Sequence, residues 1–227
     1  MSQASQDFDE DRVVKELKFS PESVLEHVRP HPVLSNKLTS EQKIEKIAKS
    51  FAEILETLGL DLNNESIKKT PQRVAKMYVN EVFAGLKSDA FPKITVIENE
   101  MAYDQMVLID NISILSCCEH HFATIDGKAR VAYIPNKRVI GLSKINRIAD
   151  FFSRRPQVQE RLTKQIADSL CYILDTKDVA VSITAKHYCV ASRGVQDEAS
   201  LTTTCDLRGS FKHDARTRSE FVSHGSK

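Results

Sequence analysis

The chain has 227 residues, which suits one domain with an appendage or two small domains and is enough to bury a hydrophobic core. Its 41% hydrophobic and 28% charged residues are ordinary for a globular protein, and a net charge of +1 excludes a general attraction to nucleic acid or membranes. No apolar run approaches the roughly 20 residues that span a bilayer, and the acidic N-terminus lacks the apolar stretch of a secretory signal. We therefore expect a cytoplasmic protein.

The cysteines indicate metal chemistry rather than disulfide bonds. There are five of them, an odd number, and Cys117 and Cys118 are adjacent. Such a set is a poor disulfide framework for a chain of this length. We interpret at least some of them as thiolate ligands in a reducing compartment.

The N-terminal third divides into an arm and a helical region. Residues 1–38 are polar, charged and interrupted by three prolines, which predicts a flexible N-terminal arm. From Thr39, apolar residues recur at helical spacing as far as Gly59, and a second helix is predicted from Thr70 to a point near Gly85. We assign residues 39–90 to an N-terminal helical hairpin region.

The remainder of the chain alternates between strand and helix patterns. The segment QMVLIDNISIL predicts a strand, and FATIDGKARVAYIP predicts a hairpin that turns at Asp126–Gly127. Ser143 is expected to cap a helix over KINRIADFFSRR, and Pro156 to open another. The segments DVAVSITAKHYCV and LTTTCDLRGSF then predict further strands. This order indicates an α+β fold with an antiparallel sheet over residues 91–227, rather than a doubly wound parallel sheet.

Two clusters of cysteine and histidine predict a metal site. Cys118 and His121 have C-x-x-H spacing, and HYC supplies His187 and Cys189, which would face the same side of a strand. Zinc accepts this mixture of thiolate and imidazole ligands, whereas the alternative is a set of buried core side chains. Four protein ligands make a closed structural site, and three with water make a catalytic one. The spacing leaves open which residues bind and which transfer protons among Cys117, Cys118, His120, His121, His187 and Cys189.

Basic residues indicate a phosphate-rich small ligand. Lys144 and Arg147 lie in the first turn of a predicted helix, where cations oppose the helix dipole unless an anion binds there. Arg73 and Lys76 repeat this spacing, and Arg193 follows the second metal cluster. The alternative for each pair is two solvated surface charges.

Several motifs in unbroken order over about residues 40–222 resemble the GTP cyclohydrolase I family. They are CEHHF-TIDGKA-VAYIP, VIGLSKINRI, RPQVQERLT-QI, HYCV followed by RG, and TTT. The resemblance implies the tunnelling fold, an antiparallel sheet with helices packed on one side, preceded by an N-terminal helical segment. It also implies a homo-oligomer, usually a decamer of two pentamers, with active sites between subunits.

The resemblance also assigns roles to individual residues. The implied metal ligands are Cys118, His121 and Cys189, with Zn2+ as the cofactor and Cys117 as a bystander. The implied catalytic residues are His120 and His187, which transfer protons, and Ser143, which lies near the ribose. The implied substrate-binding residues are Glu160 and Gln159 at the guanine edge, and Lys144, Arg147, Arg193 and a neighbouring subunit's Lys76 at the phosphates.

The implied activity is the zinc-dependent hydrolysis and rearrangement of GTP to 7,8-dihydroneopterin triphosphate with release of formate. This is the first step of pterin biosynthesis, which leads to folate or tetrahydrobiopterin. Two alternatives stay open at this point. One is a binding module in which Cys118, His121, His187 and Cys189 close a structural zinc site, and the other is a related tunnelling-fold enzyme that acts on another purine or pterin.

Overall fold

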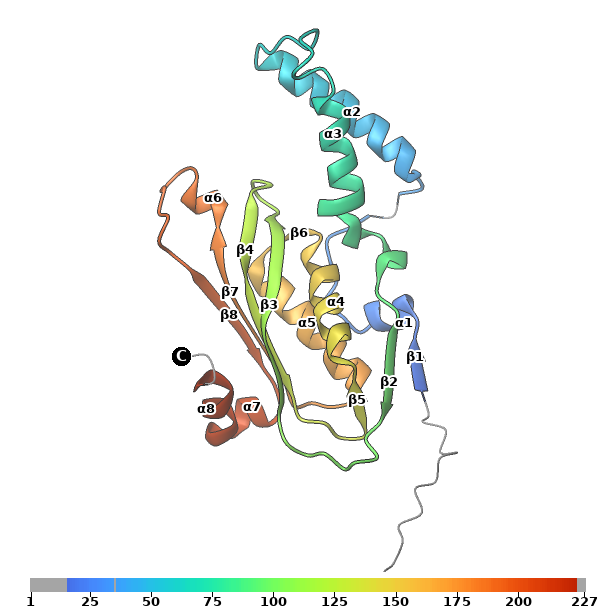
Figure 1. The fold of residues 1–227 in the computed structure, drawn as a ribbon, viewed down its shortest axis with the longest axis vertical. Coiled ribbons are helices and arrows are strands. Elements are labelled where there is room, and N and C mark those ends of the chain that lie inside the picture. The colour runs from blue at the N-terminus through green and yellow to red at the C-terminus, as the bar shows by residue number, and fades with distance from the viewer. Residues whose placement is uncertain (1–15, 35, 224–227) are drawn as a thin grey trace, which may run out of the picture.

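A computed structural model of the chain describes residues 16–34 and 36–223. Its strands form one sheet of five strands and one of three (Figure 1). The five-stranded sheet has the order β6-β3-β4-β7-β8, and all its pairings are antiparallel except that of β3 with β6. Its strands are β3 (Val107–Cys118), β4 (Thr124–Tyr133), β6 (Pro156–Gln157), β7 (Val179–His187) and β8 (Thr202–Leu207). The three-stranded sheet has the order β1-β2-β5, with β1 (Glu16–Phe19), β2 (Ile94–Glu98) and β5 (Arg138–Ile140).

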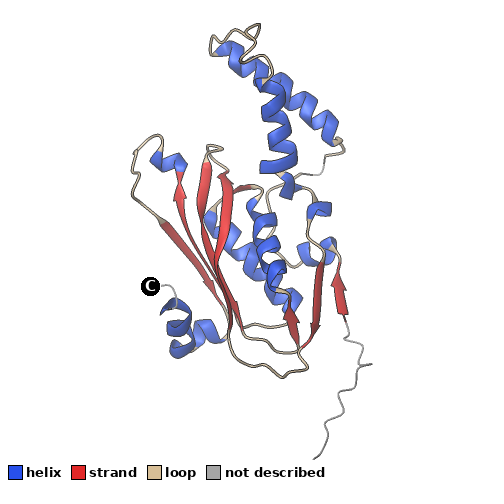
Figure 2. Cartoon of the chain, viewed as in Figure 1, coloured by secondary structure: helices blue, strands red, loops and turns tan. Residues whose placement is uncertain are grey.

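Two helices, α4 (Leu142–Ser153) and α5 (Gln159–Leu174), cover one face of the large sheet (Figure 2). On α5 the inward side chains recur every three or four residues, and Leu162, Ile166, Leu170 and Ile173 are fully buried. They meet the inward residues of the strands in one continuous core, as the 3.6-residue and two-residue periods require. The expected α+β fold, with an antiparallel sheet and helices on one side, is confirmed.

A small second cluster covers one end of the opposite face. Alternation along β4 and β7 turns Ala132 and Ala180 away from the main core, and Phe211 and Phe221 pack onto them. These phenylalanines come from the short C-terminal helices α7 (Ser210–His213) and α8 (Ala215–Ser223). No other helix of the described residues covers the rest of this face (Figure 1).

The predicted N-terminal helices project beyond one end of the large sheet (Figure 1). The first, α2 (Ser40–Thr57), begins with a capping box in which Thr39 and Gln42 bond reciprocally. The second, α3 (Thr70–Met77), continues as a π-helical turn η1 (Tyr78–Val82) and two 3-10 turns, η2 (Ala84–Leu86) and η3 (Ser88–Ala90). Gly85 lies within η2, where a Cβ would collide with the Phe151 carbonyl of α4 and would lie 2.9 Å from the carbonyl oxygen of Arg154, which follows that helix.

Part of the expected flexible arm is packed structure. Helix α1 (Pro21–Leu25) buries Val24 in the main core, and Val28 follows it there. The backbone N–H of Arg29 donates to Asp168 Oδ2 at 2.8 Å, and Gln165 Nε2 donates to the Arg29 carbonyl at 2.9 Å. The mobile-arm expectation therefore does not hold for this stretch, whereas residues 1–15 lie outside the described residues. The division at residues 38 and 90 stays a prediction.

The predicted hairpin at Asp126–Gly127 is wrong. Both residues lie inside β4, where Gly127 pairs with Ile114 on one side and with Ala185 on the other. A Cβ on Gly127 would collide with the side chain of Ala185 and would lie 2.7 Å from its Cα. The glycine therefore allows β4 and β7 to approach closely and does not form a turn; the chain turns between β3 and β4 instead.

None of the helices in the described part of the chain combines the length and apolarity that a membrane span requires.

Candidate metal centre and substrate site

The first metal-ligand cluster lies in the tight turn that joins β3 to β4. Cys118 is the last residue of β3, and its backbone N–H donates to the Ala123 carbonyl at 2.8 Å. The Phe122 N–H donates to the Cys118 carbonyl at 2.9 Å, and Phe122 has a φ of 50°. This closed turn presents His121 at the exposed end of the sheet. The sequence CEHHF thus forms the turn that the Asp-Gly pair was expected to form.

The second cluster lies where β7 ends. The strand stops at His187, and the chain then enters the single helical turn α6 (Tyr188–Ala191), which carries Cys189. The prediction that His187 and Cys189 share one face of a strand is therefore wrong. The helical turn directs Cys189 towards the β3–β4 turn, whereas His187 points to α5.

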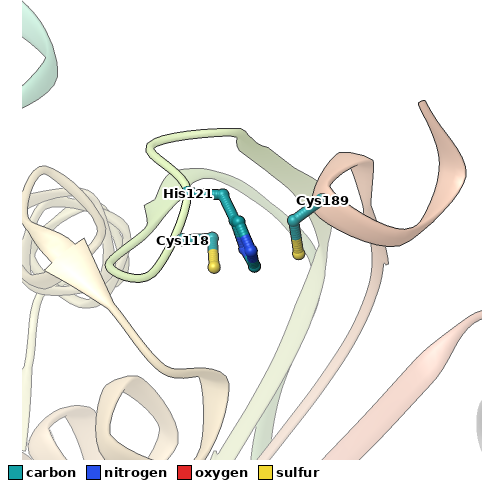
Figure 3. Close-up of side chains that lie close together, drawn as sticks. All are labelled: Cys118, His121 and Cys189. Atoms are coloured by element: carbon teal, nitrogen blue, oxygen red, sulfur yellow. The ribbon is translucent and has the colours of Figure 1, made fainter. Parts of the chain in front are cut away.

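The two clusters meet in one group of three potential ligands. One ligand atom each of Cys118, His121 and Cys189 lies within 4.8 Å of the others, and the side chains point towards one another (Figure 3). Burial and the neighbouring Cys118 thiol raise the pKa of Cys189, so a bound cation would relieve the cost of holding two thiolates together. Two sulfurs and an imidazole are a donor set that suits zinc. The residues present therefore fit the implied metal.

The other predicted candidates lie beside this group. Cys117 is buried on the opposite side of the strand, and burial raises the pKa of its thiol to about 11, which disfavours a thiolate ligand. His120 is exposed, and its Nδ1 lies 3.7 Å from Cys118 Sγ. Burial lowers the pKa of His187, while the nearby carboxylate of Glu160 acts against this. Glu160 itself is exposed in the first turn of α5.

An ion pair that the sequence did not predict supports the metal turn. Arg161 on α5 donates both guanidinium branches to the carboxylate of Glu119, at 2.7 and 3.2 Å. This hydrogen bonding lowers the pKa of Glu119, which lies between the ligand Cys118 and His120. The Glu119 N–H also donates to the Gln157 carbonyl at 3.0 Å. No spacing rule links residues 119 and 161, so only the packing of α5 against the turn reveals the pair.

The predicted phosphate-binding residues do not gather within one chain. Arg193 Nη1 donates to His121 Nε2 at 2.8 Å, which places this cation at the metal centre. Ser143, Lys144 and Arg147 lie at the start of α4, next to β5 and at the end of the molecule away from β6 and the metal turn (Figure 1). Lys76 is exposed on α3.

Fold and site together define a class: an α+β protein whose antiparallel sheet carries, at one end, a group of two cysteines and one histidine that could hold a metal ion. Comparison with known proteins narrows this class. A family model described as GTP cyclohydrolase I matches residues 47–225. The "GTP cyclohydrolase 1" proteins of Aeromonas salmonicida (strain A449) and Aeromonas hydrophila subsp. hydrophila are each 59% identical over 191 residues, covering 84% of this chain and 88% of theirs. That of Shewanella loihica is 54% identical over 202 residues, covering 89% of this chain and 94% of its own.

The chain belongs to the GTP cyclohydrolase I family, and the resemblance seen in its motifs is confirmed. It is therefore an enzyme of the hydrolase class that this family represents. The family match covers the whole large sheet, both of its packed helices and all three residues of the metal centre.

Proposed function

We propose that the protein is a zinc-dependent GTP cyclohydrolase that converts GTP into 7,8-dihydroneopterin triphosphate and formate. The observation that carries this proposal is the group formed by Cys118, His121 and Cys189 in a chain of this family. The reaction would be the first step of pterin biosynthesis, towards folate or tetrahydrobiopterin. A cytoplasmic location accords with it, because thiolate ligands persist in a reducing compartment.

The ligand count favours a catalytic centre over a closed structural one. Three protein donors are typical of catalytic zinc sites, in which the fourth position is left for water or substrate. When bound, zinc supplies Lewis-acid activation of water at neutral pH. A closed site would need a fourth protein donor, and the predicted candidate, His187, is not among the described residues whose ligand atoms group together with those of Cys118, His121 and Cys189.

We assign proton transfer to His120, whose Nδ1 lies 3.7 Å from Cys118 Sγ, and to His187, which precedes Cys189 by two residues. His187 would protonate N7 of the guanine as water adds at C8, so that the C8–N bond breaks and the imidazole ring opens to a formamide. Hydrolysis of the formamide releases formate. The ribose then rearranges, assisted by Ser143, and closure of the new ring with loss of water gives the pterin.

Recognition of guanine is assigned to Glu160. Its carboxylate is exposed in the first turn of α5 and lies near His187, where it opposes the lowering of the His187 pKa by burial. Two carboxylate oxygens match the adjacent N1–H and amino donors of guanine, whereas adenine presents no such pair. This pairing predicts that ATP is not a substrate.

We further propose that the active site is completed between subunits of a homo-oligomer, a decamer of two pentamers. The proposal is supported by the separation between the metal turn and the start of α4, which carries Lys144 and Arg147. A second copy could bring these cations to the triphosphate, together with Arg193 of the first copy and Lys76 of another. The long open edge of β8 is a site at which strands of two copies could pair.

The intersubunit site is tested by complementation. Cys189→Ser and Arg147→Ala are each expected to be inactive alone, whereas co-expression of the two should form some intact sites and restore part of the activity. Light scattering on the purified protein gives the mass of the assembly. Failure to complement in a confirmed mixed oligomer would contradict a site shared between subunits.

The activity itself is tested by mixing the metal-loaded protein with GTP. We expect the ultraviolet absorbance of a dihydropterin to appear together with one formate per GTP consumed, and no change with ATP. Metal analysis of the same sample should find zinc. A protein that holds zinc and binds GTP but releases no formate would refute the proposed reaction.

A further inference from the structure

The side chain of Gln159 has an orientation that its surroundings determine. It is almost completely buried, with 2% of its surface exposed. Its Nε2 lies 2.9 Å from the Ile183 carbonyl and 3.0 Å from the Thr202 carbonyl. Because carbonyl oxygens only accept hydrogen bonds, this end of the amide must be the NH2 group. The amide oxygen Oε1 therefore points the other way.

That orientation determines the tautomer of His187. Gln159 Oε1 lies 2.7 Å from His187 Nε2, and an amide oxygen can only accept. His187 Nε2 must therefore carry a hydrogen and donate it. Nδ1 is then the nitrogen that holds the lone pair in the neutral ring, and none of the hydrogen bonds among the described residues occupies it.

Two threonines extend this hydrogen-bond network, and in each of their hydrogen bonds only one of the two groups can be the donor. Thr163 Oγ1 donates to the main-chain carbonyl of Gln159 at 2.8 Å, which uses its single hydrogen. It must therefore accept from Thr204 Oγ1, which lies 2.7 Å away. Thr204 in turn can accept only from Gln159 Nε2, at 3.1 Å. Every donor in this network is thus assigned by main-chain carbonyls that cannot reverse their role.

We infer that Gln159 is a positioning residue, which holds His187 in its Nε2–H tautomer so that the ring meets the substrate through Nδ1. The inference rests on the proposed function, because it concerns the histidine assigned to proton transfer at guanine N7. With Nε2–H held by Gln159, Nδ1 is the nitrogen that accepts a proton, as water adds at C8, and passes it on to N7. It also changes the role expected for Gln159: an amide whose oxygen and both hydrogens are bonded inside the protein is not free to contact the guanine edge. That contact is left to the carboxylate of Glu160.

The kinetic test separates positioning from substrate binding. In Gln159→Leu we expect kcat to fall about 100-fold, the lower range of what a positioned acid or base contributes, with KM for GTP within about twofold of wild type. Thr204→Val should lower kcat in the same direction by a smaller factor, and Thr204→Ser, which keeps the hydroxyl, should restore it. A rise in KM with kcat unchanged would show a guanine contact and would overturn the inference.

Gln165→Leu is the matched control. Gln165 is a fully buried amide on the same helix, it bonds Gln157 Nε2 and the Arg29 carbonyl at 2.9 Å each, and it makes no hydrogen bond to His187. Its loss should cost stability without a selective effect on kcat. Equal zinc content in both variants shows that the metal centre is intact.

The tautomer of His187 can be measured directly by NMR, in the absence of substrate. In zinc-loaded protein with carbon-13-labelled histidine rings, the Cδ2 chemical shift distinguishes the two neutral tautomers, and His187→Asn identifies the resonance. We expect the Nε2–H tautomer in wild type and in Gln165→Leu, and a mixture in Gln159→Leu. The inference would be refuted if His187 were the Nδ1–H tautomer in wild type, or if its tautomer were the same in Gln159→Leu as in wild type. If wild type shows the expected tautomer but releases no formate from GTP, the proposed function fails instead.

Discussion

At the level of single residues, the metal centre depends on side chains that two different local structures present. Cys118 is held at the end of a paired strand, and His121 lies in the closed turn that follows it. Cys189 lies in a helical turn that interrupts the chain directly after β7. Because the β3–β4 turn and α6 are held separately, loss of the donor on one should leave the donors on the other in place.

Cys189→Ser and His121→Ala are expected to lose bound zinc and GTP turnover together, because two donors do not hold the ion against exchange with water. Zinc content by atomic absorption and formate release are measured on the same preparation. Cys117→Ser is the control, since this neighbouring buried thiol lies outside the group and should keep its metal. Full activity in a zinc-free variant would contradict the assignment.

His31 should make stability depend on pH. Burial, and then the guanidinium groups of Arg155 and Arg161, lower the pKa of His31 from 6.5 to about 4, against the opposing effect of Glu119. Between these values the unfolded chain binds a proton that the folded chain does not. The contribution of the neutral ring is therefore complete above pH 6.5 and is lost as the pH falls towards 4, by about 2 kcal/mol in total after allowance for solvent screening of this partly exposed ring.

This effect is measured by urea unfolding at several pH values between 7.5 and 4.5, for wild type and for His31→Gln. The variant cannot take up the proton, so its stability should fall less steeply below pH 6.5. Acid loss of metal occurs in both proteins and cancels in the difference. Parallel curves for the two proteins would show that His31 is not held neutral.

At the level of elements, β4 needs a glycine where it passes closest to β7. A methyl group on Gly127 would collide with Ala185 and with the Thr184 carbonyl, so Gly127→Ala should destabilise the fold by about 1–3 kcal/mol. The urea midpoint reports this loss. Gly141→Ala is the control, because a Cβ there meets nothing closer than 3.9 Å and its φ of −62° suits alanine. Equal midpoints for the two variants would contradict the close approach.

How far the sequence predicts each element depends on how local its determinants are. The helix from Thr39 to Gly59 is visible because its cap and its apolar period lie within one segment. The Asp126–Gly127 pair misleads, because a turn signal and a close-packed strand position both call for glycine. The sequence does not predict the C-terminal helices α7 and α8, because their phenylalanines are buried only by contact with a sheet face that is distant in sequence.

The site shows the same limit. The three proposed ligands come from the family resemblance, and the structure brings them together, but the sequence does not predict the partner of each supporting residue. The Arg161–Glu119 pair and the Gln159–His187 hydrogen bond both join α5 to segments remote in sequence. Only the packing of that helix against the ends of β3 and β7 brings these groups together.

At the level of the whole molecule, the candidate metal centre lies at the margin of the main core, which Cys118 joins and against which Cys189 packs. The main cluster of buried side chains runs between the sheet and helices α4 and α5, and of the three ligand residues only Cys118 belongs to it fully buried. Hydrophobic burial of this kind supplies most of the stability of a domain. The fold should therefore survive without metal.

Chelation with a strong zinc ligand is accordingly expected to abolish GTP turnover while leaving the far-ultraviolet circular dichroism and a cooperative thermal transition in place. Re-addition of zinc should restore turnover, and magnesium should not, because it prefers oxygen ligands. Collapse of the secondary structure on chelation would instead indicate a closed structural site.

The position of Cys189 late in the chain has a consequence for how the enzyme matures. The β3–β4 turn, with its two donors, leaves the ribosome well before the last donor is synthesised, and β7 must pair with β4 before Cys189 reaches the turn. Two donors on a nascent chain bind zinc weakly. In the proposed zinc enzyme, metal acquisition would therefore fall at the end of translation, after the sheet has formed, and a cell short of zinc would accumulate folded but unloaded protein.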